Sequence, residues 1–316
     1  MKGHGPVADG EAPRVAGVPT FLRLPHLPRV ADADVAVLGL PWESEGAERG
    51  GARQGPRAVR EASQTLRPLY HPAQRLQPFE RVAAVDAGDA RAGIGLPERG
   101  LEAMAAALAA VHEAGAVPLG IGGDRLVTLA GLRAAARRHG PLALVWFGAH
   151  GELLEESRGE RFAAGTVLRR ALDEGLVDPR RSAVLGLRGG LDAPDAYARL
   201  REAGFTVVPW EELMQLGTGA VAAAVERAEG PAFLSVGLDF FDPAFAPGVA
   251  EPEVGGPSSL QGLALVRGCR GLGLVGGDVV DVLPEHDVAG LTALLAATLV
   301  WDLLTLVAAT RPEAGR

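Results

Sequence analysis

Short apolar runs alternate with longer helical patterns from residue 35 onward. Val35–Leu40 (VAVLGL) and residues 142–147 (LALVWF) are continuously apolar runs, and the first ends at Pro. Such runs are typical of strands that are buried on both faces. Leu126–His139 instead has the length of a helix and stops at Gly140. The pattern therefore predicts strands and helices in regular alternation.

The predicted elements follow one another along a single domain. Strands are expected at 35–40, 82–86, 117–121, 142–147, 183–187, 206–208, 233–238 and within 271–282. Helices are expected at 56–66, 101–114, 126–139, 165–175, 193–204, 260–267 and 291–308. This order indicates crossover connections and a mostly parallel sheet. Residues 1–18 are rich in Gly, Pro, Ala and charge, so we expect a flexible arm before a single domain at 19–316.

Composition and charge narrow the class of protein. The formal net charge is −8, which leaves no basic surface for nucleic acid. Cys269 is the single cysteine, so no internal disulfide can form, as suits a reducing cytoplasm. No signal-peptide pattern opens the chain. Leu291–Ala309 is apolar but contains Trp301 and Asp302, which indicates a buried core helix rather than a membrane span. We expect a cytoplasmic protein with no nucleic-acid or membrane partner.

Polar residues directly follow three of the predicted strands. They occur in the segments Gly-Gly-Asp-Arg (122–125), Gly-Ala-His-Gly-Glu (148–152) and Asp-Phe-Phe-Asp-Pro (239–243). In parallel sheets, ligands bind at the carboxyl ends of the strands. We therefore take His150, Glu152, Asp239 and Arg125 as candidate catalytic residues.

Each candidate also has a purely structural interpretation. His150 could satisfy backbone groups in its loop, and Asp124 is better explained as a cap of the helix that begins at Leu126. Asp242 before Pro243 is a common turn residue, and Trp42 could simply cover the core. His, Asp and Glu are metal-ligating residue types. Too few of them follow these strands for two metals, although a single divalent metal is an alternative.

Several longer motifs resemble the arginase/agmatinase (ureohydrolase) family. Residues 39–63 (GLPWESEGAERGGARQGPRAVREAS) resemble the opening segment of agmatinases, and residues 119–128 (LGIGGDRLVT) resemble the Gly-Gly-Asp-His segment. Residues 145–152 (VWFGAHGE) resemble Phe-Asp-Ala-His-x-Asp, and residues 278–297 resemble the C-terminal signature. The resemblance covers about residues 19 to 305, in order and with suitable spacing.

The resemblance implies a fold, an assembly and a reaction. The fold is a three-layer α/β/α sandwich around a mostly parallel sheet of about eight strands. The assembly is a trimer or hexamer. The reaction is attack of a hydroxide, which bridges two manganese ions, on a guanidinium carbon.

The family's functional residues map onto this chain with many replacements. Three metal ligands are retained or conservatively replaced, as His150, Glu152 and Asp239. The first metal histidine falls on Arg125, and the two bridging aspartates fall on Gly148 and Gly237. The proton-shuttling histidine falls on Ala164, and the glutamate that pairs with the substrate guanidinium is shortened to Asp281.

These replacements predict a protein without a binuclear manganese site and without an expected cofactor. The main expectation is a non-hydrolytic paralogue that binds a small molecule, self-associates or partners an active ureohydrolase. The first alternative is a metal-independent enzyme of specialised metabolism that uses the same pocket. The second is a residual amidinohydrolase acting on a guanidino compound. Candidate substrate-binding residues are Asp281, Asp242, Trp42 and Glu43.

Overall fold

The computed structural model describes residues 4–6, 13–44, 49–93, 96–191 and 193–312. Within them, one eight-stranded sheet runs in the order β2-β1-β3-β8-β7-β4-β5-β6, and every pair of neighbouring strands is parallel. The strands are β1 (Val35–Leu40), β2 (Ala84–Asp89), β3 (Val117–Gly122), β4 (Ala143–Phe147), β5 (Ala183–Leu185), β6 (Thr206–Val208), β7 (Ala232–Gly237) and β8 (Leu274–Val280).

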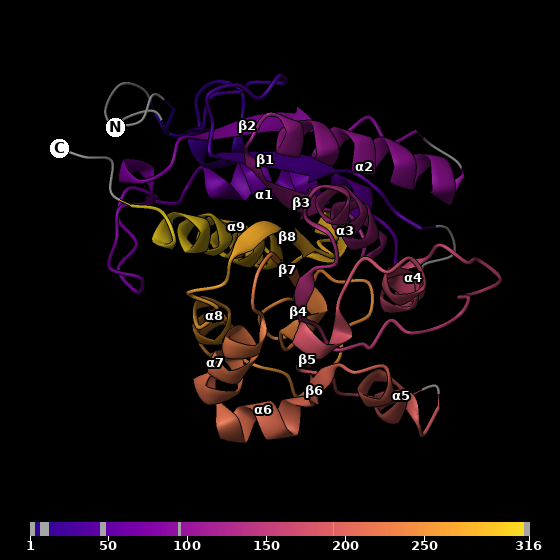
Figure 1. The fold of residues 1–316 in the computed structure, drawn as a ribbon. Helices are drawn as coiled ribbons and strands as arrows, with labels where there is room; N and C mark the ends of the chain where they lie inside the picture. Colours follow the sequence, from indigo (N-terminus) through magenta and orange to yellow (C-terminus); the bar gives the residue numbers. More distant parts are fainter. Residues whose placement is uncertain (1–3, 7–12, 45–48, 94–95, 192, 313–316) are drawn as a thin grey trace.

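Helices cover both faces of this sheet, as Figure 1 shows. One layer contains α2 (Pro97–Glu113), α3 (Leu126–His139), α4 (Val167–Asp173) and α5 (Ala196–Glu202). The other contains α1 (Gly55–Ser63), α6 (Trp210–Leu216), α7 (Thr218–Arg227), α8 (Ser259–Arg267) and α9 (Leu291–Ala309). The predicted three-layer α/β/α sandwich is therefore confirmed.

Alternate residues of each central strand pack into the two hydrophobic cores, one on each face of the sheet. In β4, Val145 and Phe147 pack on the side of α9, whereas Leu144 and Trp146 pack on the side of α3. Successive side chains point to opposite faces, and both faces are buried. The strand sequences are therefore continuous apolar runs rather than alternations of apolar and polar residues. The sheet is consequently shielded from water on both faces, except at its ends.

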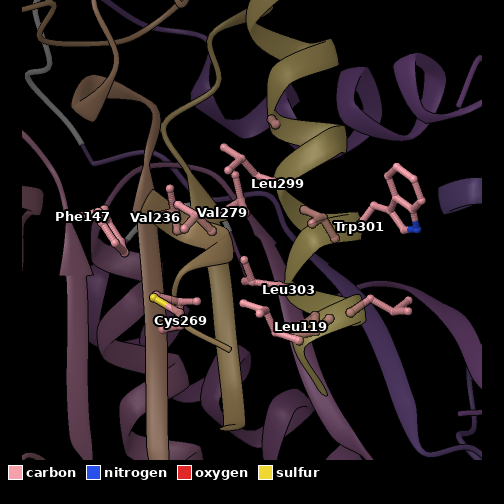
Figure 2. Packing of buried hydrophobic residues seen from close by; sticks show 14 of the residues in the cluster. Leu119, Phe147, Val236, Cys269, Val279, Leu299, Trp301 and Leu303 are labelled. Carbon is pink, nitrogen blue, oxygen red and sulfur yellow. The ribbon is translucent and has the colours of Figure 1, made fainter. Parts of the chain in front are cut away.

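The apolar helix α9 lies within the core, as its sequence predicts. Leu299 and Leu303 are at most 1% exposed, and Figure 2 shows them with Leu119 and Val279 of the sheet. Fully burying a leucine side chain is worth roughly 1.5–3 kcal/mol. The helix passes the length and hydropathy test for a membrane span, but 83% of its apolar window is buried. The apolar helix is thus a core helix of an α/β protein.

Two helices occupy residues for which the sequence pattern predicts no element. Within α6 only Trp210 and Leu213 are buried, and within α7 only Val221 and Ala224 are buried. Gly217 separates the two helices and has a φ of 56°. Two buried positions per helix are too few to produce a recognisable period of 3.6 residues.

The proposed N-terminal arm lies partly outside the described residues. Inside them, the His4 carbonyl accepts a hydrogen bond from the Ala84 amide at 3.0 Å. Gly5 lies next to Phe79. These residues therefore contact the start of β2 and the segment before it.

Candidate active site

The four central strands of the sheet bring the candidate residues together. β3, β8, β7 and β4 are consecutive neighbours, and the loop after each one carries a polar side chain. These side chains are Arg125, Asp281, Asp239 and His150, respectively. All four line one cavity of about 350 Å³, together with Glu152. The expectation from strand order is therefore met, because parallel strands end at a common edge.

Arg125 and Asp239 form a buried ion pair at the floor of this cavity. Their side chains are each 4% exposed, and Nη2 of Arg125 lies 2.9 Å from Oδ1 of Asp239. The same nitrogen donates to the Phe147 carbonyl at 2.6 Å, and Nη1 donates to Ser235 Oγ at 3.2 Å. The guanidinium also stacks 4.0 Å from the centre of a Trp146 ring. These contacts stabilise the two terminal nitrogens and the face of a largely buried cation.

Asp239 links the arginine to His150. Its Oδ2 accepts hydrogen bonds from the Ala149 amide at 2.8 Å and from His150 Nδ1 at 3.1 Å. Burial on its own raises the pKa of Asp239, but the charge of Arg125 and these hydrogen bonds outweigh burial. The net pKa of Asp239 is well below its usual range. Asp239 is consequently ionised at neutral pH and fixes the orientation of the imidazole.

His150 is charged at neutral pH. Burial lowers its pKa, but the hydrogen bond and charge of Asp239 outweigh this effect and raise the pKa to about 9. The second ring nitrogen, Nε2, lies 3.7 Å from Oε1 of Glu253. The ring is held from both sides and its side chain remains 21% exposed in the cavity. His150 can therefore donate a proton to a bound molecule.

Within the described part of the chain, the carboxyl groups of Glu152 and Asp281 form no ion pair, and nearby positive charge only partly offsets their burial. Burial is the main cause that raises the pKa of Glu152 to about 8 and that of Asp281 to about 7. Both have a positive φ, 42° for Glu152 and 71° for Asp281. Residues other than Gly seldom adopt this conformation, and such strain concentrates at functional sites. Oxygens of Asp281 accept only weak hydrogen bonds from the Ala250 amide, at 3.3 and 3.4 Å.

We expect Asp281→Asn to stabilise the protein in alkaline solution. In the folded protein, the pKa of Asp281 is raised to about 7. The contribution of this carboxyl group to stability is therefore fully present below its pKa in the unfolded chain and is lost as pH rises through its pKa in the folded protein. Asparagine avoids this loss and tolerates a positive φ. The advantage of the variant in unfolding free energy should grow by about 2–4 kcal/mol between about pH 4 and about pH 8.5, as urea denaturation at both pH values would measure.

Asp242→Asn provides a control whose stability relative to the parent protein should change with pH in the opposite direction. Asp242 accepts hydrogen bonds from the amides of Ala244, Gly255 and Gly256. Burial raises the pKa of Asp242, but these hydrogen bonds help to lower it, and the net pKa is below its usual range. Its contribution is present above the unfolded pKa and lost as pH falls through the folded pKa. That variant should lose stability at about pH 8.5. An equal response of both variants to pH would contradict this interpretation of Asp281.

Three of the candidate substrate-binding residues lie outside the cavity lining, which corrects the expectation for them. Trp42 is 6% exposed and packs so closely on Gly100 of α2 that a Cβ there would lie 2.2 Å from its ring. Glu43 binds the Gly51 amide and Arg53 at 2.8 and 2.9 Å. Asp242 orders the turn after β7 through its backbone hydrogen bonds. Their side chains are used for local structure.

Sequence reasoning missed other residues of the cavity, namely Arg188, Tyr197 and Glu251. Arg188 is 4% exposed and donates to the carbonyls of Asp239, Phe240, Phe241 and Glu253. It thereby fixes the loop that carries Asp239. The signal was available, because Arg188 follows an apolar run at the end of β5, as the other site residues follow theirs.

The described residues do not fit the two manganese ions that the family resemblance implies. They contain no group of three or more His, Cys, Asp or Glu side chains placed to hold a metal. A Cβ added at Gly148 or Gly237 would lie 2.3 or 2.0 Å from Arg125 Nη2. A divalent ion about 4 Å from this guanidinium would also face a repulsion of about 8 kcal/mol at an effective dielectric constant of about 20.

Asp124 has the structural role that its sequence context predicts. Its Oδ1 accepts a hydrogen bond from the Leu126 amide at 2.9 Å, at the start of α3. Its Oδ2 accepts one from the Ser44 amide at 2.5 Å. Asp124 therefore ties the loop after β1 to the first turn of α3, and it forms part of the wall of the cavity.

Comparison with known proteins identifies similar chains over nearly the whole length. A model described as the Arginase family matches residues 33–305. Guanidinopropionase of Pseudomonas aeruginosa is 44% identical over 307 residues, which cover 96% of each chain. Mitochondrial agmatinase of Gallus gallus is 36% identical over 297 residues, covering 93% of this chain and 87% of that protein. The structure of proclavaminate amidinohydrolase from Streptomyces clavuligerus matches with a TM-score of 0.90 and 36% identity, covering 95% of this chain and 100% of that one.

These relatives overturn the main functional expectation from the sequence. The replaced residues predicted a non-hydrolytic paralogue. Relatives that are 36–44% identical over nearly the whole chain are instead named as enzymes that act on guanidino compounds. The expectation was wrong because it inferred loss of all activity from the loss of individual side chains, whereas function depends on the whole site.

The family itself follows from the sequence match, which the fold supports. The match covers far more than half of the chain, and the sheet and its flanking helices superpose on a solved relative along nearly its entire length. The chain belongs to the arginase family.

Proposed function

We propose that this protein is an amidinohydrolase that cleaves a small guanidino compound into urea and an amine. The observation that carries the proposal is the pair of carboxyl groups, Glu152 and Asp281, whose pKa values burial raises at the wall of the cavity. The similarity to a guanidinopropionase at 44% identity supports the same reaction class.

The two carboxyl groups form a receptor for a cation. Arg125 is already paired with Asp239, and its charge lowers the pKa values of Glu152 and Asp281 by less than burial raises them. A guanidinium group would supply the missing positive charge and up to five N–H donors in one plane. Binding would then ionise the carboxyl groups, since an opposite charge nearby favours the charged form.

The reaction can be written with every atom accounted for. Water adds to the guanidinium carbon through its oxygen, and the bond from this carbon to the alkyl-bearing nitrogen breaks. The alkyl nitrogen leaves as an amine, and the protonated urea that remains gives its hydroxyl proton to this amine, so the products are neutral urea and an alkylammonium ion. Glu152, once ionised, takes a proton from the water, and His150 gives a proton to the leaving nitrogen. The excess proton on Glu152 then returns to His150 through solvent, which restores the site.

We place a carboxylate on the other end of the substrate. Arg158 and Arg199 both line the cavity and both side chains reach solvent. Arg199 is paired with Asp195, and both of these side chains are more than half exposed. An acidic tail could exchange with such a weakly held surface partner at little cost. Guanidino acids are therefore the first substrates to test, ahead of the amine agmatine.

The test is urea release from 3-guanidinopropionate, 4-guanidinobutyrate and agmatine by the purified protein. We expect turnover of at least one guanidino acid, and loss of the reaction in Asp281→Asn because the carboxylate that attracts the guanidinium is gone. Glu61→Gln changes an exposed acid of α1 that pairs with Arg57, and it should behave as the parent protein. Absence of urea from every compound, with or without added manganese, would refute the proposal.

We also place the protein in the cytoplasm. Cys269 is buried, and burial raises the pKa of its thiol far above the usual range, so the chain makes no use of an oxidising compartment. Cell fractionation would test this location. Self-association stays a prediction, which light scattering of the purified protein would test.

A further inference from the structure

The floor of the cavity is built around the guanidinium of Arg125 as a fixed object. Its Nη2 lies at 2.9 Å from Asp239 Oδ1 and at 2.6 Å from the Phe147 carbonyl. A Cβ at residue 148 would lie 2.3 Å from this nitrogen, and a Cβ at residue 237 would lie 2.0 Å from it. Contacts below 3.0 Å essentially never occur for real Cβ atoms. Glycine at both positions is therefore what gives the guanidinium its space.

The cation is held from below as well as from the sides. Nη1 donates to Ser235 Oγ, which lies 3.2 Å from Thr128 Oγ1. The planar group rests on the Trp146 ring. Residues from β4, β7 and α3 thus surround one charge, and each of them belongs to the rigid centre of the sheet.

The charge acts on the reactive side chain through Asp239. One oxygen of Asp239 faces Arg125 and the other accepts the hydrogen bond from His150 Nδ1. Arg125 therefore keeps the carboxylate in the rotamer that orients the imidazole. Both oxygens of Asp239 are therefore engaged by groups of the protein itself.

We infer that Arg125 is the resident cation of this site, in the place where the family resemblance puts a metal, and that it is a positioning residue for His150. The reaction then proceeds without a divalent metal. The catalytic part of this inference rests on the proposed function, whereas the site for the cation rests on the geometry alone.

The first experiment measures bound metal on the unmodified protein. The protein is purified without chelator and dialysed against manganese, and its metal content is determined by elemental mass spectrometry. We expect near-zero manganese per chain and the same rate of urea release with manganese or with EDTA. One or more manganese ions per chain, lost in His150→Ala, would overturn the inference.

The same preparation separates this inference from the proposed function. Protein that binds no manganese and releases no urea from any guanidino compound, with or without added manganese, would refute the proposed function and leave Arg125 as the resident cation. Urea release that requires bound manganese would support hydrolysis and refute the role of Arg125.

Variants of Arg125 test the positioning role directly. Arg125→Gln should lower kcat by about 10²-fold, as expected for loss of one preorganised charged contact, with little change in KM. Arg125→Lys keeps the charge and should recover part of the rate. The triple variant Arg125→His/Gly148→Asp/Gly237→Asp should gain manganese binding. A normal kcat in folded Arg125→Gln would overturn the positioning role. If that variant does not fold, the metal content of the unmodified protein decides whether Arg125 is the resident cation.

Discussion

Replacement of His150 by alanine is expected to lower the kcat for urea release by about 10²- to 10⁴-fold, the usual contribution of a general acid or base. The charged imidazole is the group best placed to protonate the leaving nitrogen, because Asp239 raises its pKa to about 9 and fixes its ring through Nδ1. Steady-state urea assays on the folded variant would measure the loss. In the parent protein the rate should also fall as pH rises through about 9.

His286→Ala is the matched control. His286 is exposed and lies in the short 3-10 helix Pro284–His286 before α9, outside the cavity lining. Its removal should leave kcat within about twofold, because surface substitutions away from special features have little effect. If both variants lose activity equally, or if neither does, proton transfer by His150 is excluded.

Replacement of Asp239 by alanine is expected to reduce the unfolding free energy by about 3–5 kcal/mol, the range for removing one partner of a buried ion pair. Arg125 would stay buried at 4% exposure without its counter-ion. The Ala149 amide and His150 would each lose an acceptor. Chemical denaturation at neutral pH would measure the change, and urea release should be lost together with stability.

A variant of a surface ion pair and a double variant of the buried pair are compared with Asp239→Ala. Glu61→Ala removes the exposed partner of Arg57 in α1 and should cost less than about 1 kcal/mol. The double variant Arg125→Met/Asp239→Ala removes both buried charges, so it should be more stable than Asp239→Ala alone. A double variant that is less stable than Asp239→Ala would contradict an electrostatic origin of the loss.

The fold was predictable because its main strands are buried on both faces. β1 is an unbroken apolar run whose bounds the sequence pattern places correctly, and Leu126–His139 ends where Gly140 adopts a φ of 75°. Short helices escaped prediction because they bury few side chains. The boundaries of α4 and α5 were too wide by several residues, since capping and tertiary contacts set helix ends more than composition does.

The sequence predicted the site residues correctly only where the order of the strands in the sheet determines their position. Arg125, His150 and Asp239 follow central strands, so the topology alone brings them together. Trp42 and Asp242 also follow strands, but their side chains turn into the core and into a tight turn, and sequence position does not reveal side-chain direction. The positive φ of Glu152 and Asp281 likewise depends on neighbouring loops, and no local sequence signal for it exists.

The close fit between Arg125 and the two glycines has a consequence for how the site can evolve. Adding a side chain at Gly148 or Gly237 first would collide with the guanidinium. Shortening Arg125 first would leave a void beneath a buried carboxylate. Each single step thus passes through a less stable protein, although the combined change need not be unstable. The three positions are epistatic, and natural variation at this floor should appear as linked triplets rather than as isolated substitutions.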